Sequence, residues 1–148
     1  MISFKTYTFK QLTSENLYSL LKLRSEVFVV EQDCVYQDID SKDQKALHVL
    51  GFFNNELVAY SRLFSKGIYF NEASIGRVVV ANKYRNKDFG HLLMRFSIAE
   101  INKHFNEDII TISAQEYLQK FYEQHGFVKV SESYLEDNIP HIRMKKIN

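Results

Sequence analysis

The chain has 148 residues, of which 45% are hydrophobic and 25% charged, so its size and composition are those of one globular domain and we expect residues 1–148 to form a single domain. Its net charge of +1 gives no reason to expect a nucleic-acid partner, and no apolar run approaches the ~20 residues that span a bilayer. Cys34 is the only cysteine, which excludes an intrachain disulfide, and the N-terminus lacks a signal-peptide core, so we expect a cytoplasmic protein.

The N-terminal quarter predicts a strand followed by a helix. Apolar and polar residues alternate over residues 3–10, which indicates a strand. Thr13 then suits the N-cap of a helix, because its hydroxyl can accept a backbone N–H of the first turn. Apolar residues recur at helical spacing from Leu17 to Phe28, so we expect this helix to end near Glu31 and to pack on a sheet.

An acidic, irregular segment follows over residues 33–45. It carries four aspartates and few apolar residues: Asp33, Asp38, Asp40 and Asp43. One interpretation is a solvated loop, and the other is a substrate-facing lip whose acidity would favour a cationic amine, because long irregular loops in small domains are often functional. The sequence leaves both interpretations open.

Three strands are predicted next, joined as a meander. Residues 46–53 and 57–64 are apolar and β-branched runs separated by Asn54-Asn55, a tight-turn signal. Residues 74–81 form a third such run, which we expect to be buried.

A polar, basic turn and a helix that begins on glycine follow the third strand. Residues 82–89 are polar and basic, Gly90 comes next, and apolar residues at helical spacing predict a helix over residues 90–104. A strand, a basic turn and a glycine at a helix N-terminus suit a phosphate, because the free N–H groups and the helix dipole attract an anion. The alternative is an ordinary solvated turn.

The C-terminal third predicts the rest of the sheet. Residues 109–114 read as a buried strand, parallel to residues 74–81 because a helix connects the two. A short helix over residues 117–125 ends at Gly126, and a strand over residues 127–130 follows. Residues 131–141 read as a loop, and residues 142–145 close the sheet.

Two motifs in this pattern resemble the GCN5-related N-acetyltransferase (GNAT) family. The family's first motif reads Arg/Gln-x-x-Gly-x-Gly/Ala, in which Arg85 and Gly90 match and Asp88 replaces the middle glycine. In residues 121–127 (FYEQHGF), Tyr122 stands where the family's second motif has a helical tyrosine shortly before Gly-Phe. Further segments, at residues 27–32, 36–40, 114–115 and 136–142, resemble the ElaA-type branch, so the likeness covers nearly the whole chain.

The resemblance implies an α/β (α+β) GNAT fold. That fold has a mixed, mostly antiparallel, splayed sheet of about six or seven strands with helices on both faces. It also implies a transferase that moves an acetyl group directly from acetyl-CoA to a primary amine in a ternary complex, with no metal. The implied acceptor is a small-molecule or protein amine, not a nucleic acid or a membrane, and a homodimer stays open.

The implied cofactor site is a set of backbone groups on the strand and the turn. Backbone groups of the strand would pair with the pantetheine arm, and amides of the turn and helix start would bind the pyrophosphate. These residues are Val78, Val79, Val80, Arg85, Asn86, Lys87, Asp88, Phe89, Gly90 and His91.

The implied catalytic residues are a general acid and a base. A phenol, with an ordinary pKa of about 10, can protonate a thiolate of similar basicity, which assigns Tyr122 as the acid; the alternative is a packed structural aromatic. Glu31 is the first candidate for the base, although a solvated helix-end glutamate would look the same. His48 and His141 are further base candidates. The side chains expected around the acceptor are Arg77, Gln115, His48, His141 and Asp40.

Two other functions share this fold. A non-catalytic acetyl-CoA sensor or interaction module would keep the cofactor loop, and an acyltransferase could use a longer acyl chain. The sequence does not separate these alternatives from an acetyltransferase.

Overall fold

The structure is a computed structural model that describes residues 1–147, and within them eight strands form one mixed sheet. The strand order is β1-β2-β3-β4-β5-β8-β6, and β7 pairs with β8. The strands are β1 (Ser3–Thr8), β2 (Leu47–Phe53), β3 (Glu56–Phe64), β4 (Ala73–Val80), β5 (Ile109–Gln115), β6 (Val128–Lys129), β7 (Tyr134–Glu136) and β8 (Ile139–Ile147). The helices are α1 (Ser14–Arg24), α2 (Phe89–Phe105) and α3 (Gln119–Glu123).

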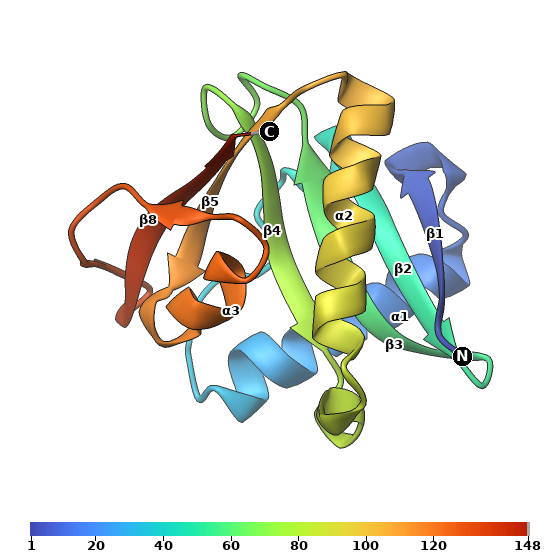
Figure 1. Ribbon diagram of the computed structural model, residues 1–148. Coiled ribbons are helices and arrows are strands. Elements are labelled where there is room, and N and C mark those ends of the chain that lie inside the picture. The colour runs from blue at the N-terminus through green and yellow to red at the C-terminus, as the bar shows by residue number, and fades with distance from the viewer. Residues whose placement is uncertain (148) are drawn as a thin grey trace.

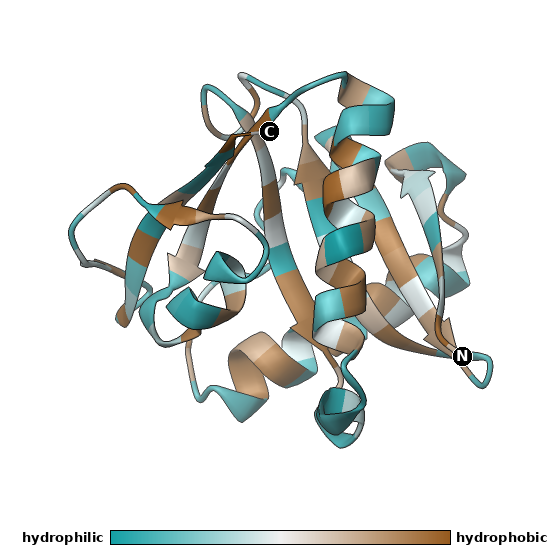
Figure 2. Cartoon of the chain, in the orientation of Figure 1, coloured by the Kyte–Doolittle hydropathy of each residue, from teal (hydrophilic) through white to brown (hydrophobic). Residues whose placement is uncertain are grey.

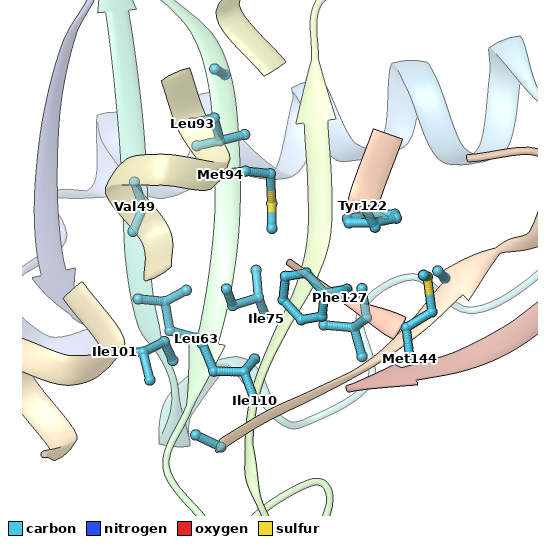
Figure 3. Close-up of a cluster of buried hydrophobic side chains, with 14 of the residues drawn as sticks. Val49, Leu63, Ile75, Leu93, Met94, Ile101, Ile110, Tyr122, Phe127 and Met144 are labelled. Atoms are coloured by element: carbon cyan, nitrogen blue, oxygen red, sulfur yellow. The ribbon is translucent and has the colours of Figure 1, made fainter. Parts of the chain in front are cut away.

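Helices cover both faces of this sheet. Figure 1 shows α2 lying across one face and α1 behind the other. In Figure 2, hydrophilic and hydrophobic bands alternate along α2, and the central strands beside it carry long hydrophobic stretches. The larger core cluster lies between α2 and the sheet and includes Leu93, Met94, Ile101 and Ile110 (Figure 3), and a smaller one joins α1 to β2, β3 and β4. The expected mixed, mostly antiparallel sheet with helices on both faces is confirmed, with eight strands in the described residues rather than six or seven.

The strands β4 and β5 run in parallel and then diverge (Figure 1). They pair only at Ala73 with Ile110 and at Ser74 with Thr111. Beyond these pairs the register of β4 against β3 shifts, and Arg77 adopts a left-handed φ of 49°. A bulge of this kind bends a strand and re-aims its side chains, so β4 turns away from β5 and leaves part of its backbone edge open.

Local signals in the sequence agree with most of these elements. The Thr13 hydroxyl accepts the Asn16 N–H at 3.1 Å, as expected of an N-cap. Asn54 and Asn55 both have positive φ, 51° and 62°, which is the geometry of a tight hairpin turn. The helix after Thr13 is α-helical up to Arg24 and continues as a π-helix over Ser25–Glu31.

The predicted loop over residues 131–141 is wrong in part. It contains β7 and the start of β8, which form a hairpin closed by Asp137 and Asn138 at φ of 51° and 64°. An aspartate followed by an asparagine is a turn signal that the prediction did not use.

Among the described residues, no helix combines the length and the apolar run needed to cross a membrane.

Candidate active site

A cleft of about 500 Å³ opens where β4 and β5 diverge. Its walls come from the π-helical segment Ser25–Glu31, from β4 and β5, from α3, and from the β7–β8 hairpin. Ten of the predicted site residues line it: Glu31, Arg77, Val78, Val79, Val80, Arg85, Gly90, Gln115, Tyr122 and His141. The splay of the sheet therefore brings together residues that lie up to 110 positions apart in the chain.

One end of the cleft is formed by the start of α2. Residues Asn82–Lys87 form a short 3₁₀ helix, and Asp88 then takes a left-handed φ of 66° before α2 begins. Glycine favours this conformation and aspartate tolerates it, so Asp88 is compatible with this turn. Its side chain makes no capping hydrogen bond.

The first amides of α2 have no partner within the helix. The Leu92 N–H is bonded to the Asp88 carbonyl at 3.3 Å, and the three residues before Leu92 lie in the first turn, where intrahelical acceptors are lacking. A Cβ placed on Gly90 would meet the Phe121 ring at 3.5 Å, an ordinary contact, so Gly90 keeps this helix start open without any steric requirement for glycine.

The other residues predicted for the cofactor turn do not line the cleft with their side chains. Asn86, Lys87 and Asp88 are exposed, whereas the Phe89 side chain is buried in the core, 6% exposed. The His91 ring packs on Phe121 with centroids 4.7 Å apart. A role for these five residues is therefore limited to their backbone groups or to contacts outside the cleft.

Glu31 lies in the cleft, but its carboxylate is already paired. Arg85 donates hydrogen bonds to both of its oxygens, and the Arg85 Nε–H donates to the Val80 carbonyl at 3.1 Å. Both groups remain partly exposed, at 35% for Glu31 and 40% for Arg85. With both oxygens occupied, Glu31 is not free to take a proton here, so this pairing weighs against the predicted role as base.

Tyr122 lies on α3, in the cleft wall, and is 7% exposed. Its ring packs edge-on against the Phe127 ring with centroids 6.1 Å apart. Figure 3 shows both side chains in the buried hydrophobic cluster. Burial raises the pKa of its phenol, and Tyr117 raises it further. Tyr122 therefore keeps its proton at neutral pH, as a general acid must.

Three of the four aspartates in the acidic segment point inward and pair with arginines, whereas Asp33 is exposed. We call these six residues the arginine–aspartate cluster: Arg24, Arg62, Arg77, Asp38, Asp40 and Asp43. The Arg24 Nε–H donates to Asp38 at 2.9 Å, and its NH1 group donates to Asp43 at 2.8 Å. Arg62 donates to both oxygens of Asp40 at 2.8 Å and to Asp43 at 2.8 Å.

Asp40 is therefore not a substrate residue in this structure. It does not line the cleft, and its carboxylate is held by Arg62 and, at 3.4 Å, by Arg77. Burial raises the pKa of Asp40, but the hydrogen bonds from Arg62 outweigh it and hold the pKa at about 2. Arginines neutralise three of the four aspartates inside the protein, which weighs against an acidic lip, although Cys34 and Tyr36 of the same segment line the cleft.

His48 is likewise misassigned as a substrate residue. It is fully buried on β2, outside the cleft. Its Nε2 lies 2.9 Å from the Asp43 carbonyl, which can only accept, so Nε2 carries the proton and Nδ1 accepts from the Tyr60 hydroxyl at 2.6 Å. Burial lowers the pKa of His48, so it is a neutral structural histidine.

The β7–β8 hairpin carries polar groups that the sequence analysis missed. The Ser113 hydroxyl on β5 donates to Glu136 Oε1 at 3.0 Å and lies 2.6 Å from the Tyr134 hydroxyl. His141 Nε2 is 3.5 Å from Glu136 Oε2. The tight turn between β7 and β8 sets Glu136 opposite Ile139 and Tyr134 opposite His141, so recognising Asp137-Asn138 as a turn would have brought Glu136 to the site.

Comparison with known proteins gives consistent matches. The family model described as an acetyltransferase (GNAT) domain matches residues 7–148. The protein ElaA of Escherichia coli strain K12 is 40% identical over 99% of this chain and 97% of its own, and its crystal structure superposes with a TM-score of 0.92 over 99% of each chain.

Two further solved structures share the fold. An acyl-CoA N-acyltransferase from Pseudomonas aeruginosa is 38% identical, with a TM-score of 0.93 over 99% of each chain. A GNAT family acetyltransferase from Elizabethkingia anophelis with acetyl-CoA bound is 18% identical, with a TM-score of 0.66 over 99% of this chain and 98% of that one.

Proposed function

Because the chain belongs to the GNAT acetyltransferase family, in its ElaA-like branch, and is an acyltransferase, we propose that it transfers an acetyl group from acetyl-CoA directly to a primary amine in a ternary complex. The observation that carries this proposal is the cleft itself. It is lined by one open strand edge, by the start of a helix and by a buried phenol. Each of these three groups suits one part of acetyl-CoA.

The helix start suits the pyrophosphate. Unpaired N–H groups at the first turn of α2 and the positive end of the helix dipole attract an anion. Gly90 adds no side chain in their way, and Arg85 lies at the same end of the cleft. The fold neighbour from Elizabethkingia anophelis holds acetyl-CoA, which supports the same ligand here.

The open edge of β4 suits the pantetheine arm. Val78, Val79 and Val80 line the cleft beyond the last β4–β5 pair, so backbone groups on the open edge of β4 can pair with amides of an extended ligand; the Val80 carbonyl already accepts the Arg85 Nε–H. An N–H here is also placed to stabilise a negative oxygen that develops on the thioester carbonyl. Acetyl-CoA supplies the activated acetyl group, and the protein supplies position and proton transfer.

Tyr122 suits the departing thiolate. A phenol is protonated at neutral pH, so a proton is present when the carbon–sulfur bond breaks, and burial makes Tyr122 hold it more tightly by raising the pKa. A general acid typically contributes ~10²–10⁴-fold to the rate. In Tyr122→Phe the ring still packs against Phe127, so the loss should fall on kcat more than on the KM for acetyl-CoA.

The experiment measures thiol release from acetyl-CoA with a panel of primary amines, together with calorimetric binding of CoA. Gly90→Asp places a carboxylate at the helix start and should weaken CoA binding strongly. Gly90→Ala is its matched control, because its Cβ makes only an ordinary contact with Phe121 and should leave binding nearly unchanged. Equal CoA affinity in Gly90→Asp and wild type would overturn the site, and full activity in Tyr122→Phe would make that residue structural.

A further inference from the structure

The imidazole of His141 faces the carboxylate of Glu136, and no hydrogen-bond donor of the described residues lies between His141 Nε2 and Glu136 Oε2 when the imidazole is neutral. Its Nδ1 is 2.7 Å from the Ile139 carbonyl, which can only accept, so Nδ1 carries a proton. In the neutral ring Nε2 then holds a lone pair, and it lies 3.5 Å from Glu136 Oε2, a second acceptor. Two acceptors at this distance require a donor between them or a proton on Nε2.

No lysine or arginine in the described part of the chain supplies a donor to the Glu136 carboxylate. Of the salt bridges within residues 1–147, none joins it to a lysine or an arginine. Ser113 occupies only the other oxygen, Oε1, at 3.0 Å, and the Tyr134 hydroxyl holds Ser113 in turn at 2.6 Å. This chain of hydroxyls fixes the carboxylate and leaves Oε2 available toward His141.

The pair also faces the cleft. Glu136, His141 and Ser113 all line it, on the same surface as Val78 and Tyr122. His141 is 9% exposed and Glu136 39% exposed in their side chains, so the pair is sheltered but reachable. Arg77 lines the cleft as well, but its charge is engaged by Asp38 and Asp40.

We propose that Glu136 and His141 form the acceptor site, in which Glu136 binds the substrate's ammonium group and His141 Nε2 takes its proton. An alkylammonium has three N–H donors and can donate to both acceptors at once. This inference rests on the proposed acetyl transfer, because it names the group that prepares the amine for attack.

The proton balance of the reaction then closes. One N–H bond of the ammonium breaks and its proton bonds to Nε2, which leaves a neutral amine and an imidazolium paired with Glu136. The amine nitrogen bonds to the acetyl carbon, the carbon–sulfur bond breaks, and the thiolate takes the proton of the Tyr122 hydroxyl. The second amine proton restores that phenol, and the imidazolium proton is released to solvent.

The site also defines a substrate class. Glu136 repels a carboxylate placed next to the reacting nitrogen, so the acceptor is a primary alkylamine, such as a lysine-type side chain, rather than the α-amine of a free amino acid. Pentylamine and norleucine make a matched pair, because they differ by that one carboxylate. We expect pentylamine to be the better acceptor by about tenfold or more, which corresponds to about 1.4 kcal/mol.

The first test is binding, without catalysis. Imidazole ¹H–¹⁵N spectra of the protein are recorded with pentylammonium at millimolar concentration. We expect the Nε2 signal of His141 to move in wild type and to stay in place in Glu136→Gln. A His141 signal that pentylammonium does not move in wild type, or moves equally in Glu136→Gln, overturns the proposal.

The second test is kinetic, at saturating acetyl-CoA with pentylamine as acceptor. His141→Gln should lower kcat by about 10²-fold or more at pH 7, and the deficit should shrink as rising pH deprotonates the amine in solution. Glu136→Gln should mainly raise the acceptor KM, with the acetyl-CoA KM unchanged. Wild-type values in both variants overturn the proposal, whereas an inactive wild type with every amine overturns the acetyl transfer itself.

Other ionisable groups around His141 can also contribute to the pH dependence of kcat. Glu136 and Tyr134 on β7 face it directly, and β5 contributes only the neutral Ser113 and Gln115. The remaining titratable or charged groups that line the cleft are Glu31, Cys34, Tyr36, Arg77, Arg85, Tyr117, Tyr122 and Asp137.

The chain offers matched controls for both substitutions. His104 Nε2 lies 3.3 Å from Glu100 on α2, which is another histidine–glutamate contact but outside the cleft. His104→Gln should therefore keep wild-type kinetics and the pH profile. Glu132→Gln removes the same charge as Glu136→Gln from an exposed position close to it in the chain and should leave the acceptor KM unchanged.

Discussion

The arginine–aspartate cluster and the Glu136–His141 pair are both charged groups near the same sheet, but they differ in how completely they are paired. In the cluster, Arg24 is fully buried and donates to two aspartates, and Asp43 accepts from two arginines. In the pair, one carboxylate oxygen faces one imidazole nitrogen at 3.5 Å with no arginine or lysine bound to it among residues 1–147. The number of carboxylates in a segment therefore says little about substrate binding, because what matters is which carboxylate lacks an internal cation.

The largest effect should come from breaking the cluster. Arg24→Met leaves buried aspartates without one of their cations, and removing one partner of a buried ion pair typically costs about 3–5 kcal/mol. Urea unfolding should show that loss. Lys22→Met on the same helix is the control, since its pair with Glu26 is 65% and 59% exposed and should change stability by no more than about 0.5 kcal/mol.

If Arg24→Met and Lys22→Met proved equally stable, the cluster would not hold the segment over residues 33–45 in place. The cluster would then not differ from the Glu136–His141 pair in its contribution to stability.

A pair of substitutions should separate the two regions. Asp40→Asn weakens hydrogen bonds to Arg62 and should lower the free energy of unfolding by about 1–3 kcal/mol while leaving the acceptor KM unchanged. Glu136→Gln should do the reverse, raising the acceptor KM with a stability change of about 0.5 kcal/mol or less. A raised acceptor KM in Asp40→Asn would return the acidic segment to the substrate site.

The pH dependence of stability should also reveal the buried groups. Burial lowers the pKa of His48, and burial together with His91 lowers that of His125, so the folded protein binds fewer protons than the unfolded chain. Stability from these groups is then complete above the ordinary histidine pKa of about 6.5 and is lost as the pH falls below it.

Asp40 extends the same loss to lower pH. Its pKa of about 2 lies below the ordinary value of 3.8, so its contribution declines as the pH falls from about 4 to about 2. Denaturation midpoints measured between pH 7.5 and pH 3 should fall in these two stages. A flat midpoint from pH 7.5 to pH 5 would contradict the lowered pKa values of His48 and His125.

The smallest effect should come from the exposed Glu31–Arg85 pair. Exposed ion pairs are worth about 0–1 kcal/mol, and Glu31→Gln frees Arg85 to meet a phosphate, so CoA should bind up to about fivefold more tightly. The turnover rate should stay unchanged, because the hydrogen bonds from Arg85 occupy both Glu31 oxygens and weigh against Glu31 as the base. A loss of 10²-fold or more in kcat would make Glu31 the base after all and would weaken the case for His141.

The fold and one end of the cleft could be predicted from sequence, because local signals determine them. Thr13 caps its helix and Asn54-Asn55 forms a tight turn, as predicted. The strand–helix–strand connection makes β5 parallel to β4, also as predicted. The cofactor end follows from a helix start and a backbone edge, which need only secondary structure in the right order.

Only part of the acceptor end could be predicted: His141 was a candidate and lines the cleft, but the partners of each charged group depend on pairing across the sheet. Whether Asp40 meets solvent or Arg62 is decided by residues 22 positions away, and no local pattern carries that information. His48 and His141 look alike in sequence, yet one is enclosed by Tyr60 and Asp43 and the other lines a cleft. Glu136 was missed because the hairpin that positions it was read as a loop.

The short pairing between β4 and β5 has a consequence for the lifetime of the protein. Backbone pairing joins β4 to β5 at two residue pairs, so a ligand in the gap beyond Ser74 can complete the sheet there. A ligand that binds the folded state alone adds RT ln(1 + [L]/Kd) to the free energy of unfolding, about 2.7 kcal/mol at one hundred times Kd. Amide hydrogen exchange of Val78 to Val80 should slow by the factor 1 + [L]/Kd, which corresponds to this gain in the free energy of unfolding. The supply of acetyl-CoA would thereby set both the rate at which this enzyme works and the fraction of its copies open to proteolysis.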